Sequence, residues 1–130
     1  IDVLIPPVEE GDQGGHIRNL ESDFSALTVP GLDLAFEDLE HIEMSGTILN
    51  GSEVTRTLPV CGPGAFVVLK ALAWKRRGKQ KDAYDLFYVV RNYGDEPGAV
   101  AERLQPLLAA GNPEAEEATD TATTKPSKQT

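Results

Sequence analysis

The clearest pattern in the chain is the apolar stretch over residues 66–74, which a single charged residue, Lys70, interrupts. On a period of 3.6 residues per turn, Lys70 falls on the same face as apolar neighbours one turn away on either side. The pattern predicts a helix that begins at Pro63, because proline is favoured in a first turn, and that runs to about Arg77. Gly78 follows as a candidate left-handed cap.

Two further helices are expected after the first. The second runs from about Lys81 to Asn92 and carries Asp82 and Asp85 in its first turn, three residues apart and therefore on the same side. The third is weaker and covers residues 98–110, where we expect Pro106 to end or kink the helix.

β-type runs fill the first part of the chain: Ile1–Ile5, Leu27–Phe36, His41–Leu49 and Glu53–Val60. The second run suggests two short strands or one strand bent at Pro30-Gly31, and the polar, Gly-rich residues 11–23 suggest a surface loop. Asn50-Gly51 is a strong hairpin signal between the last two runs, with a loop of two residues or more. We therefore expect an α+β fold, in which a small mixed β-sheet in the N-terminal half is followed by a helical half.

The end of the chain has a different composition. Residues 111–130 contain no aromatic and no large aliphatic side chain. Burying so little apolar surface does not compensate for the conformational entropy lost when the segment becomes ordered. We therefore expect a disordered C-terminal tail whose deletion costs little stability. The chain then divides into a β-rich part (1–62) and a helical part (63–110) of the same domain, followed by the tail (111–130).

Composition and charge narrow the classes of function. The chain has 130 residues, 40% of them hydrophobic, a single cysteine and a net charge of −9. No apolar run reaches the roughly 18–20 residues of a spanning helix, and one cysteine forms no internal disulfide, so we expect a cytoplasmic protein. The acidic total argues against generic nucleic-acid binding. Half of the twelve Lys and Arg residues nevertheless fall between Lys70 and Lys81, which indicates a local anion site.

Lys70 is the first candidate for chemistry, because an ammonium group on an apolar face needs a counter-charge or an anionic ligand. We expect it within reach of Asp82 or Asp85, the nearest acids beyond the turn. The alternative is a snorkelling lysine whose stem covers apolar surface. The two aspartates could bind a metal, orient Lys70 or form ion pairs with the turn, and helix capping is their simplest explanation.

Asp2 is a second candidate, since it is the single polar residue in the first β-type run. It either meets a metal or another cation, or belongs to a frayed edge at the chain end. The basic turn over residues 75–81 either binds phosphates or is a solvated helix end. His16 and His41 lack metal-ligand spacing, and no Gly-rich phosphate-loop motif is present.

The block LKALAWKRRGKQKDAYDLFYVV resembles the AbiEii/AbiGii-type toxin nucleotidyltransferases of the DNA polymerase β-like superfamily. That family has a helix with a functional lysine, a turn rich in Lys and Arg, and then an (R/K)DxxDL helix. The resemblance implies catalytic roles for Lys70, Asp82 and Asp85, and NTP binding by Lys70, Arg77, Lys79 and Lys81. The opening IDVLIPP looks like the strand with the superfamily's third carboxylate, which implies a Mg²⁺ ligand at Asp2.

One part of the family pattern is missing. Its first signature, a Gly-Ser or Gly-Gly turn before a strand with paired acids, has no counterpart, because Gly51-Ser52 is followed by EVTR. The simplest account is a chain truncated before Ile1, which we expect to be inactive by itself. The intact protein would transfer a nucleotide from an NTP to tRNA or to a protein, with a cognate antitoxin as partner. The alternative is a non-catalytic interaction module with a structural Lys–Asp ion-pair network.

Overall fold

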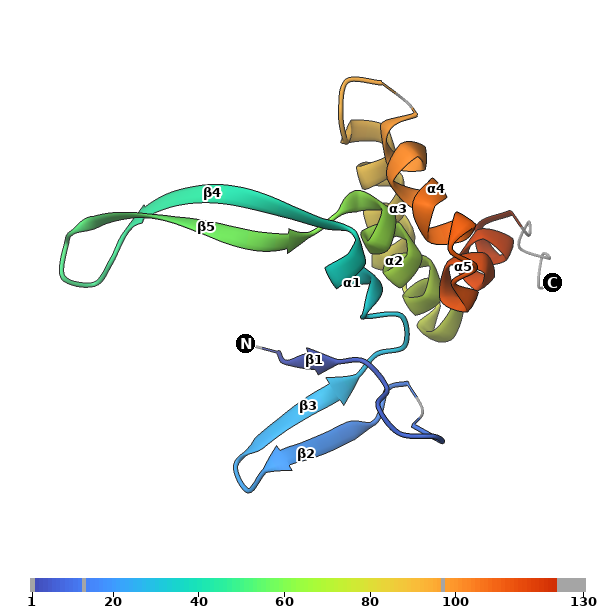
Figure 1. Cartoon of the computed structure of the whole chain (residues 1–130), viewed down its shortest axis with the longest axis horizontal. Helices are drawn as coiled ribbons and strands as arrows, with labels where there is room; N and C mark the ends of the chain where they lie inside the picture. The colour runs from blue at the N-terminus through green and yellow to red at the C-terminus, as the bar shows by residue number, and fades with distance from the viewer. Residues whose placement is uncertain (1, 13, 97, 124–130) are drawn as a thin grey trace.

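A computed structural model of the chain describes residues 2–12, 14–96 and 98–123 and has an α+β fold (Figure 1). The strands in the described residues are β1 (Leu4–Ile5), β2 (Ile17–Glu21), β3 (Phe24–Thr28), β4 (Leu39–Thr47) and β5 (Glu53–Cys61). The helices are α1 (Leu34–Glu37), α2 (Pro63–Arg77), α3 (Gln80–Asn92), α4 (Ala99–Ala109) and α5 (Pro113–Thr123). The expected order of small mixed β-structure followed by helices is confirmed.

The first sheet has the strand order β1-β3-β2, with β1 parallel and β2 antiparallel to β3. Of the predicted strand Ile1–Ile5, the structure forms Leu4–Ile5, and Ile1 lies outside the described residues. The surface loop predicted over 11–23 was wrong for Ile17–Glu21, which forms β2. This strand leaves most of its side chains exposed, so its backbone pairing with β3 produces no hydrophobic alternation in the sequence.

The segment Leu27–Phe36 bends at the expected place, although its second half is helical. β3 ends at Thr28, and Gly31 has a φ of +80°, a left-handed conformation that glycine adopts without strain. Helix α1 follows and buries Leu34 completely against the helical core. The prediction of β-structure up to Phe36 was therefore wrong, because the burial of Leu34 outweighs the local β-type pattern.

The predicted hairpin is confirmed, and it forms a sheet of its own. β4 and β5 pair from Leu39↔Cys61 to Thr47↔Glu53. Asn50-Gly51 lies in the connection, where Gly51 has a φ of +87° and its N–H donates to the Ile48 carbonyl at 2.8 Å. Figure 1 shows this long ribbon projecting away from the helices.

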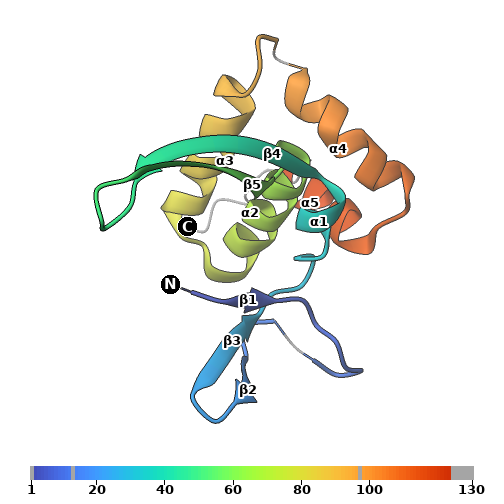
Figure 2. The same ribbon diagram turned by 60° about the vertical axis from the view of Figure 1, so that its left-hand side comes forward.

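The helical half is arranged around α2, which packs against α3, α4 and α5 (Figure 2). The predicted bounds of α2 are confirmed, and Gly78 has a φ of +61° and donates its N–H to the Trp74 carbonyl at 2.8 Å. Helix α4 continues through Pro106, which was expected to end or kink it. Among the described helices, none combines the length and the apolar character needed to cross a bilayer.

The disorder predicted from residue 111 onward was wrong for Pro113–Thr123, which forms α5 and packs on α2. Residues 124–130 lie outside the described residues. Ala115 and Ala118 are buried in the same core cluster as Leu72 and Leu107. Small alanine side chains let two helices approach closely, so α5 contributes packing without the large aliphatic residues on which the prediction depended.

Candidate functional site

Lys70 lies between the two aspartates of α3, as the spacing predicted. Its Nζ is 2.7 Å from Asp85 Oδ2 and 3.3 Å from Asp82 Oδ1. The aspartates stand three residues apart on the side of α3 that faces α2, and Lys70 reaches them from the middle of α2. The Phe66 ring centroid is 5.7 Å from the same ammonium, within cation–π range.

Two further cations complete the cluster, which we call the Lys70 cluster: Lys70, Arg77, Lys81, Asp82 and Asp85. Arg77 binds Asp82 with both ends of its guanidinium, at 2.6 Å from Nε and 2.6 Å from Nη2. Lys81 Nζ lies 2.9 Å from Asp85 Oδ2. Each aspartate is therefore shared by two cations, a geometry that favours charge-assisted hydrogen bonds.

These contacts fix the protonation states of the cluster. The pKa of Asp82 is lowered to about 2, first by its hydrogen bonds from Arg77 and then by those from Lys70, although burial opposes this shift. The hydrogen bond from Lys70 is also the main reason that the pKa of Asp85 is lowered. The pKa of Lys70 is raised, chiefly by Asp85. At neutral pH Lys70 is therefore a cation, suited to bind an anion but not to act as a general base.

The cluster has one unit of surplus positive charge, from three cations against two carboxylates. Lys79 and Arg76 add to it, because both are exposed and neither has an ionic partner among the described residues. Arg77 and Lys81 also keep 51% and 78% of their side-chain surface exposed. The turn between α2 and α3 therefore presents cations to solvent beside a fixed ionic core, which suits a phosphate-bearing ligand.

Asp2 does not belong to this cluster in the structure. It is exposed and precedes β1, and none of the ion pairs of the described residues includes it. In the described ranges, no group of three or more His, Cys, Asp or Glu side chains is arranged to hold a metal ion. The role of Asp2 as a metal ligand therefore stays a prediction.

A second polar network, which the sequence analysis missed, joins α2, α4 and the base of the hairpin. The buried Asp38 carboxylate accepts the Ala65 N–H at 3.0 Å and the Arg103 Nε at 2.8 Å. Arg103 Nη1 also donates to Glu40 at 2.8 Å, and the Tyr93 hydroxyl donates to the same carboxylate. That hydrogen bond is the main reason that the pKa of Tyr93 is raised.

The one sequence signal for this network was the start of α2. Its N-cap, Gly62, has no side chain, so the first N–H groups need an acceptor from elsewhere. Asp38 supplies that acceptor from another element. Its partner Arg103 lies so far along the chain that no local spacing connects the two residues.

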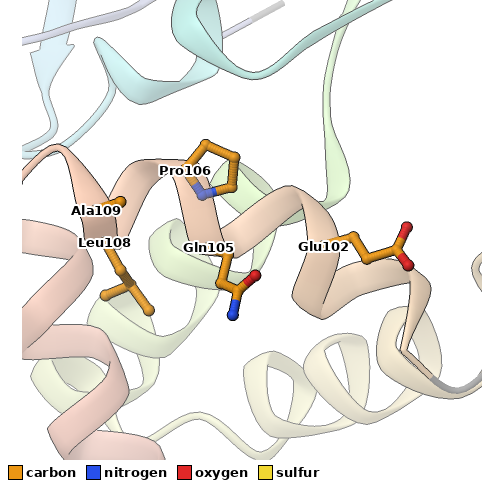
Figure 3. A pocket seen from close by; sticks show the side chains of 5 residues that line it. All are labelled: Glu102, Gln105, Pro106, Leu108 and Ala109. Atoms are coloured by element: carbon orange, nitrogen blue, oxygen red, sulfur yellow. The ribbon is translucent and has the colours of Figure 1, made fainter.

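Other features carry no comparable chemistry. The pocket shown in Figure 3 lies along α4 and is lined by Glu102, Gln105, Pro106, Leu108 and Ala109, without a cation or a member of the Lys70 cluster. Burial and the nearby Asp38 raise the pKa of the Cys61 thiol to about 11, so it is not a thiolate nucleophile at neutral pH.

Comparisons of the chain with family models, with curated proteins and with solved structures found no match. The resemblance to the toxin nucleotidyltransferases therefore depends on the residues of α2, the turn and α3. The geometry of the Lys70 cluster is the evidence from which a function is argued.

Proposed function

We propose that the Lys70 cluster and the adjacent basic turn bind the triphosphate of an NTP in a nucleotidyltransferase-like domain of the toxin type. The observation that carries the proposal is the position of Lys70 on α2. Its Nζ is held 2.7 Å from Oδ2 of Asp85, a residue of α3, the helix that follows the cationic turn. The aspartates hold the ammonium group in place, and 22% of the lysine side chain stays open to solvent. A fixed, partly exposed ammonium is suited to electrostatic stabilisation of phosphoryl oxygens.

The residues have two kinds of role in this proposal. Lys70 and the exposed cations Arg77, Lys79 and Lys81 donate to phosphate oxygens. Asp82 and Asp85 act as positioning residues, because their hydrogen bonds fix Lys70 and Arg77. A pre-arranged set of donors loses less conformational freedom on binding than free lysine side chains do.

Mg²⁺ enters the proposal as the companion ion of the triphosphate. Among the described residues, no three His, Cys, Asp or Glu side chains are arranged to hold a metal ion, and the carboxylates of Asp82 and Asp85 already accept from Lys and Arg. The transfer itself, from an NTP to tRNA or a protein acceptor, a cognate antitoxin and a cytoplasmic location all derive from the resemblance and the composition.

A second candidate is a non-catalytic interaction module in which the same cluster is structural. Asp82 favours this candidate, because it is completely buried and both of its oxygens already accept from Lys70 and Arg77. Among the described residues, no buried side-chain nitrogen or oxygen lacks a hydrogen-bond partner. A self-satisfied network needs no ligand to explain it.

Lys79 separates the two candidates, because it carries charge without an ionic partner among the described residues. Titration calorimetry with Mg·ATP and Mg·GTP measures binding, and thermal unfolding measures stability. The NTP site predicts that Lys79→Ala weakens binding several-fold at unchanged melting temperature, and that Lys70→Ala weakens it roughly tenfold or more. Arg56→Ala, on β5, is the charge-matched control and should change neither quantity. Absence of NTP binding, together with a lower melting temperature for Lys70→Ala, would support the structural module.

Transfer is tested separately by incubation with labelled NTPs, Mg²⁺ and total tRNA. Labelling is expected from a protein that also carries the Gly-Ser turn and the paired-acid strand of the family, and it should fall by orders of magnitude in Lys70→Ala. Labelling that ignores the Lys70→Ala substitution would remove Lys70 from the proposed catalytic set.

A further inference from the structure

The hairpin β4–β5 is exposed along most of its length. Residues 41–47 of β4 are all exposed, as are residues 55–60 of β5, and the ribbon projects from the helices (Figure 1). An isolated two-stranded ribbon is marginally stable in water, and its unpaired edges are templates for further strand pairing. A ribbon with nine residues in each strand therefore has surface for another strand.

The hydrogen-bond register shows which backbone groups face outward. The Gly62 N–H donates to the Asp38 carbonyl at 2.7 Å, and the Ile48 N–H donates to the Ser52 carbonyl at 3.0 Å. These pairs lie at the two ends of one ladder, so even-numbered residues of β4 bond to β5 and odd-numbered residues turn their N–H and C=O groups outward. His41, Glu43 and Ser45 therefore present their backbone groups at the free edge of β4.

The two edges of the hairpin differ in one residue. Pro59 lies opposite His41, at an outward-facing position in the middle of β5. Proline has no N–H, and its ring obstructs the approach of another strand, so the outer edge of β5 is closed to strand addition. No proline interrupts β4, whose edge stays open.

One face of the hairpin is mainly apolar. Even-numbered residues of both strands share this face, which carries the large hydrophobic side chains Ile42, Met44, Leu58 and Val60 together with the charged Glu40 and Arg56. Each of the four hydrophobic residues is between 40% and 54% exposed. Pairing at the β4 edge would extend this face into a wider apolar surface and protect part of it from water.

We propose that a second copy of this chain pairs with the β4 edge, strand antiparallel to strand, to form a two-fold symmetric dimer with a continuous four-stranded sheet. A two-fold axis beside Ile42 places His41 of each copy opposite Glu43 of the other, with the two Ile42 side chains together on the apolar face. His41 and Glu43 stand next to outward-facing backbone groups, so both members of the pair meet at hydrogen-bonded positions.

The pairing of an imidazole N–H donor on His41 with the carboxylate of Glu43 favours this register and a second copy as the occupant. A shift of the axis to Glu43 would place two like charges directly opposite each other, which is unfavourable. A shift to Met44 would place Glu43 opposite Ser45 and leave His41 opposite Thr47. The sequence of β4 is therefore complementary to itself in one register, as an isologous interface requires.

A matched pair of proline substitutions tests the interface. Ser45 and Thr55 lie opposite each other, are joined by a side-chain hydrogen bond of 2.8 Å, and both turn their N–H groups outward, at opposite edges. Ser45→Pro and Thr55→Pro therefore lose the same internal contact. Light scattering coupled to size-exclusion chromatography, over a concentration series, should show a wild-type mass that approaches twice that of the chain. Ser45→Pro should raise the dimer dissociation constant roughly tenfold or more, and Thr55→Pro should leave it unchanged.

A charge exchange tests the register without touching the backbone. His41→Glu should weaken the dimer several-fold by placing Glu opposite Glu43 of the other copy, and the double variant His41→Glu/Glu43→Lys should restore it. If both proline variants lose the same strand signal in circular dichroism, the prolines have disrupted the hairpin itself. The charge-exchange variants then test the interface in their place. A wild-type chain that stays monomeric at every concentration overturns the proposal. A dimer indifferent to both Ser45→Pro and the charge exchange does so as well.

Discussion

The carboxylate of Asp38 accepts the backbone N–H of Ala65 at 3.0 Å, so the first turn of α2 is capped by a residue that lies outside this helix. The cap of α2 depends on a close approach at Gly62, where an added Cβ would lie 2.3 Å from the same carboxylate. The polar network and the helix start therefore depend on one another. Removing the Asp38 carboxylate would leave the Ala65 N–H without its acceptor, and a side chain at Gly62 would push the carboxylate away from that N–H.

The first prediction follows from this cap. Asp38→Ala should lower the free energy of unfolding by about 2–4 kcal/mol, because it removes the cap and leaves Arg103 without its buried partner. Urea denaturation measures the change. Asp33→Ala is the control, since Asp33 is exposed and makes no side-chain cap bond at the start of α1, and it should change stability by less than about 0.5 kcal/mol. Equal effects of the two variants would contradict the capping role of Asp38.

The second prediction concerns pH. The pKa of Asp82 is about 2 in the folded chain against an ordinary value of 3.8, so the unfolded chain binds a proton first as the pH falls. The stability that Asp82 contributes is therefore fully present above about pH 4 and is lost as the pH falls toward 2, with Asp85 acting in the same direction.

Urea denaturation between pH 7 and pH 2 tests this dependence. Asp82→Asn should be less stable than the wild type at pH 7, by about 2 kcal/mol, and the difference should shrink as the pH approaches 2. Asp23→Asn, an exposed position between β2 and β3, is the matched control. A difference between wild type and Asp82→Asn that stays constant down to pH 2 would show that the charge of Asp82 does not stabilise the fold.

The third prediction tests the packing of α5. Ala115→Glu places a carboxylate where the native side chain has no exposed surface and should cost roughly 3 kcal/mol or more. Ala122→Glu makes the same chemical change at an exposed position of the same helix and should cost at most a few tenths of a kcal/mol. Thermal unfolding distinguishes the two variants. Similar melting temperatures would mean that α5 does not pack on α2 in solution.

The fourth prediction concerns the crossing of α2 and α4. A Cβ at Gly64 would lie 2.5 Å from the carbonyl oxygen of Arg103. Gly64→Ala should therefore destabilise the protein by about 1–2 kcal/mol, even though alanine has the higher helix propensity. Gly98→Ala is the comparison, because a Cβ at Gly98 meets nothing within 4 Å. If Gly64→Ala stabilises the chain in urea denaturation, the two helices are farther apart than the structure places them.

The sequence predicted those elements whose signals are local. Gly78 ended α2 where a left-handed residue was expected, Asn50-Gly51 turned the hairpin, and the lone charge on an apolar face required the partners that Lys70 has. Each of these inferences depends on residues within about one or two turns of a helix or on a short loop. The contact of Lys70 with Asp82 and Asp85 was predictable because only a short turn separates the two helices.

The sequence did not predict elements that depend on distant partners. Ala115 and Ala118 carry little hydrophobic signal, and their burial depends on the shape of α2. β4 and β5 form a sheet separate from that of β1, β2 and β3. Strand propensity does not predict which strands pair with one another. Arg103 binds Asp38 and Glu40, which lie about half the length of the chain away in the sequence, so no motif marks it as part of a site.

The position of α5 has a consequence for synthesis on the ribosome. Leu72 of α2 is synthesised well before Ala115 of α5, which is buried in the same core cluster. At translation rates of roughly 5–20 residues per second, the helix α2 emerges seconds before the helix that closes over it. During that interval the apolar side of α2 is exposed to chaperones and to premature association. The core of the helical half is completed only after α5 has emerged from the ribosome.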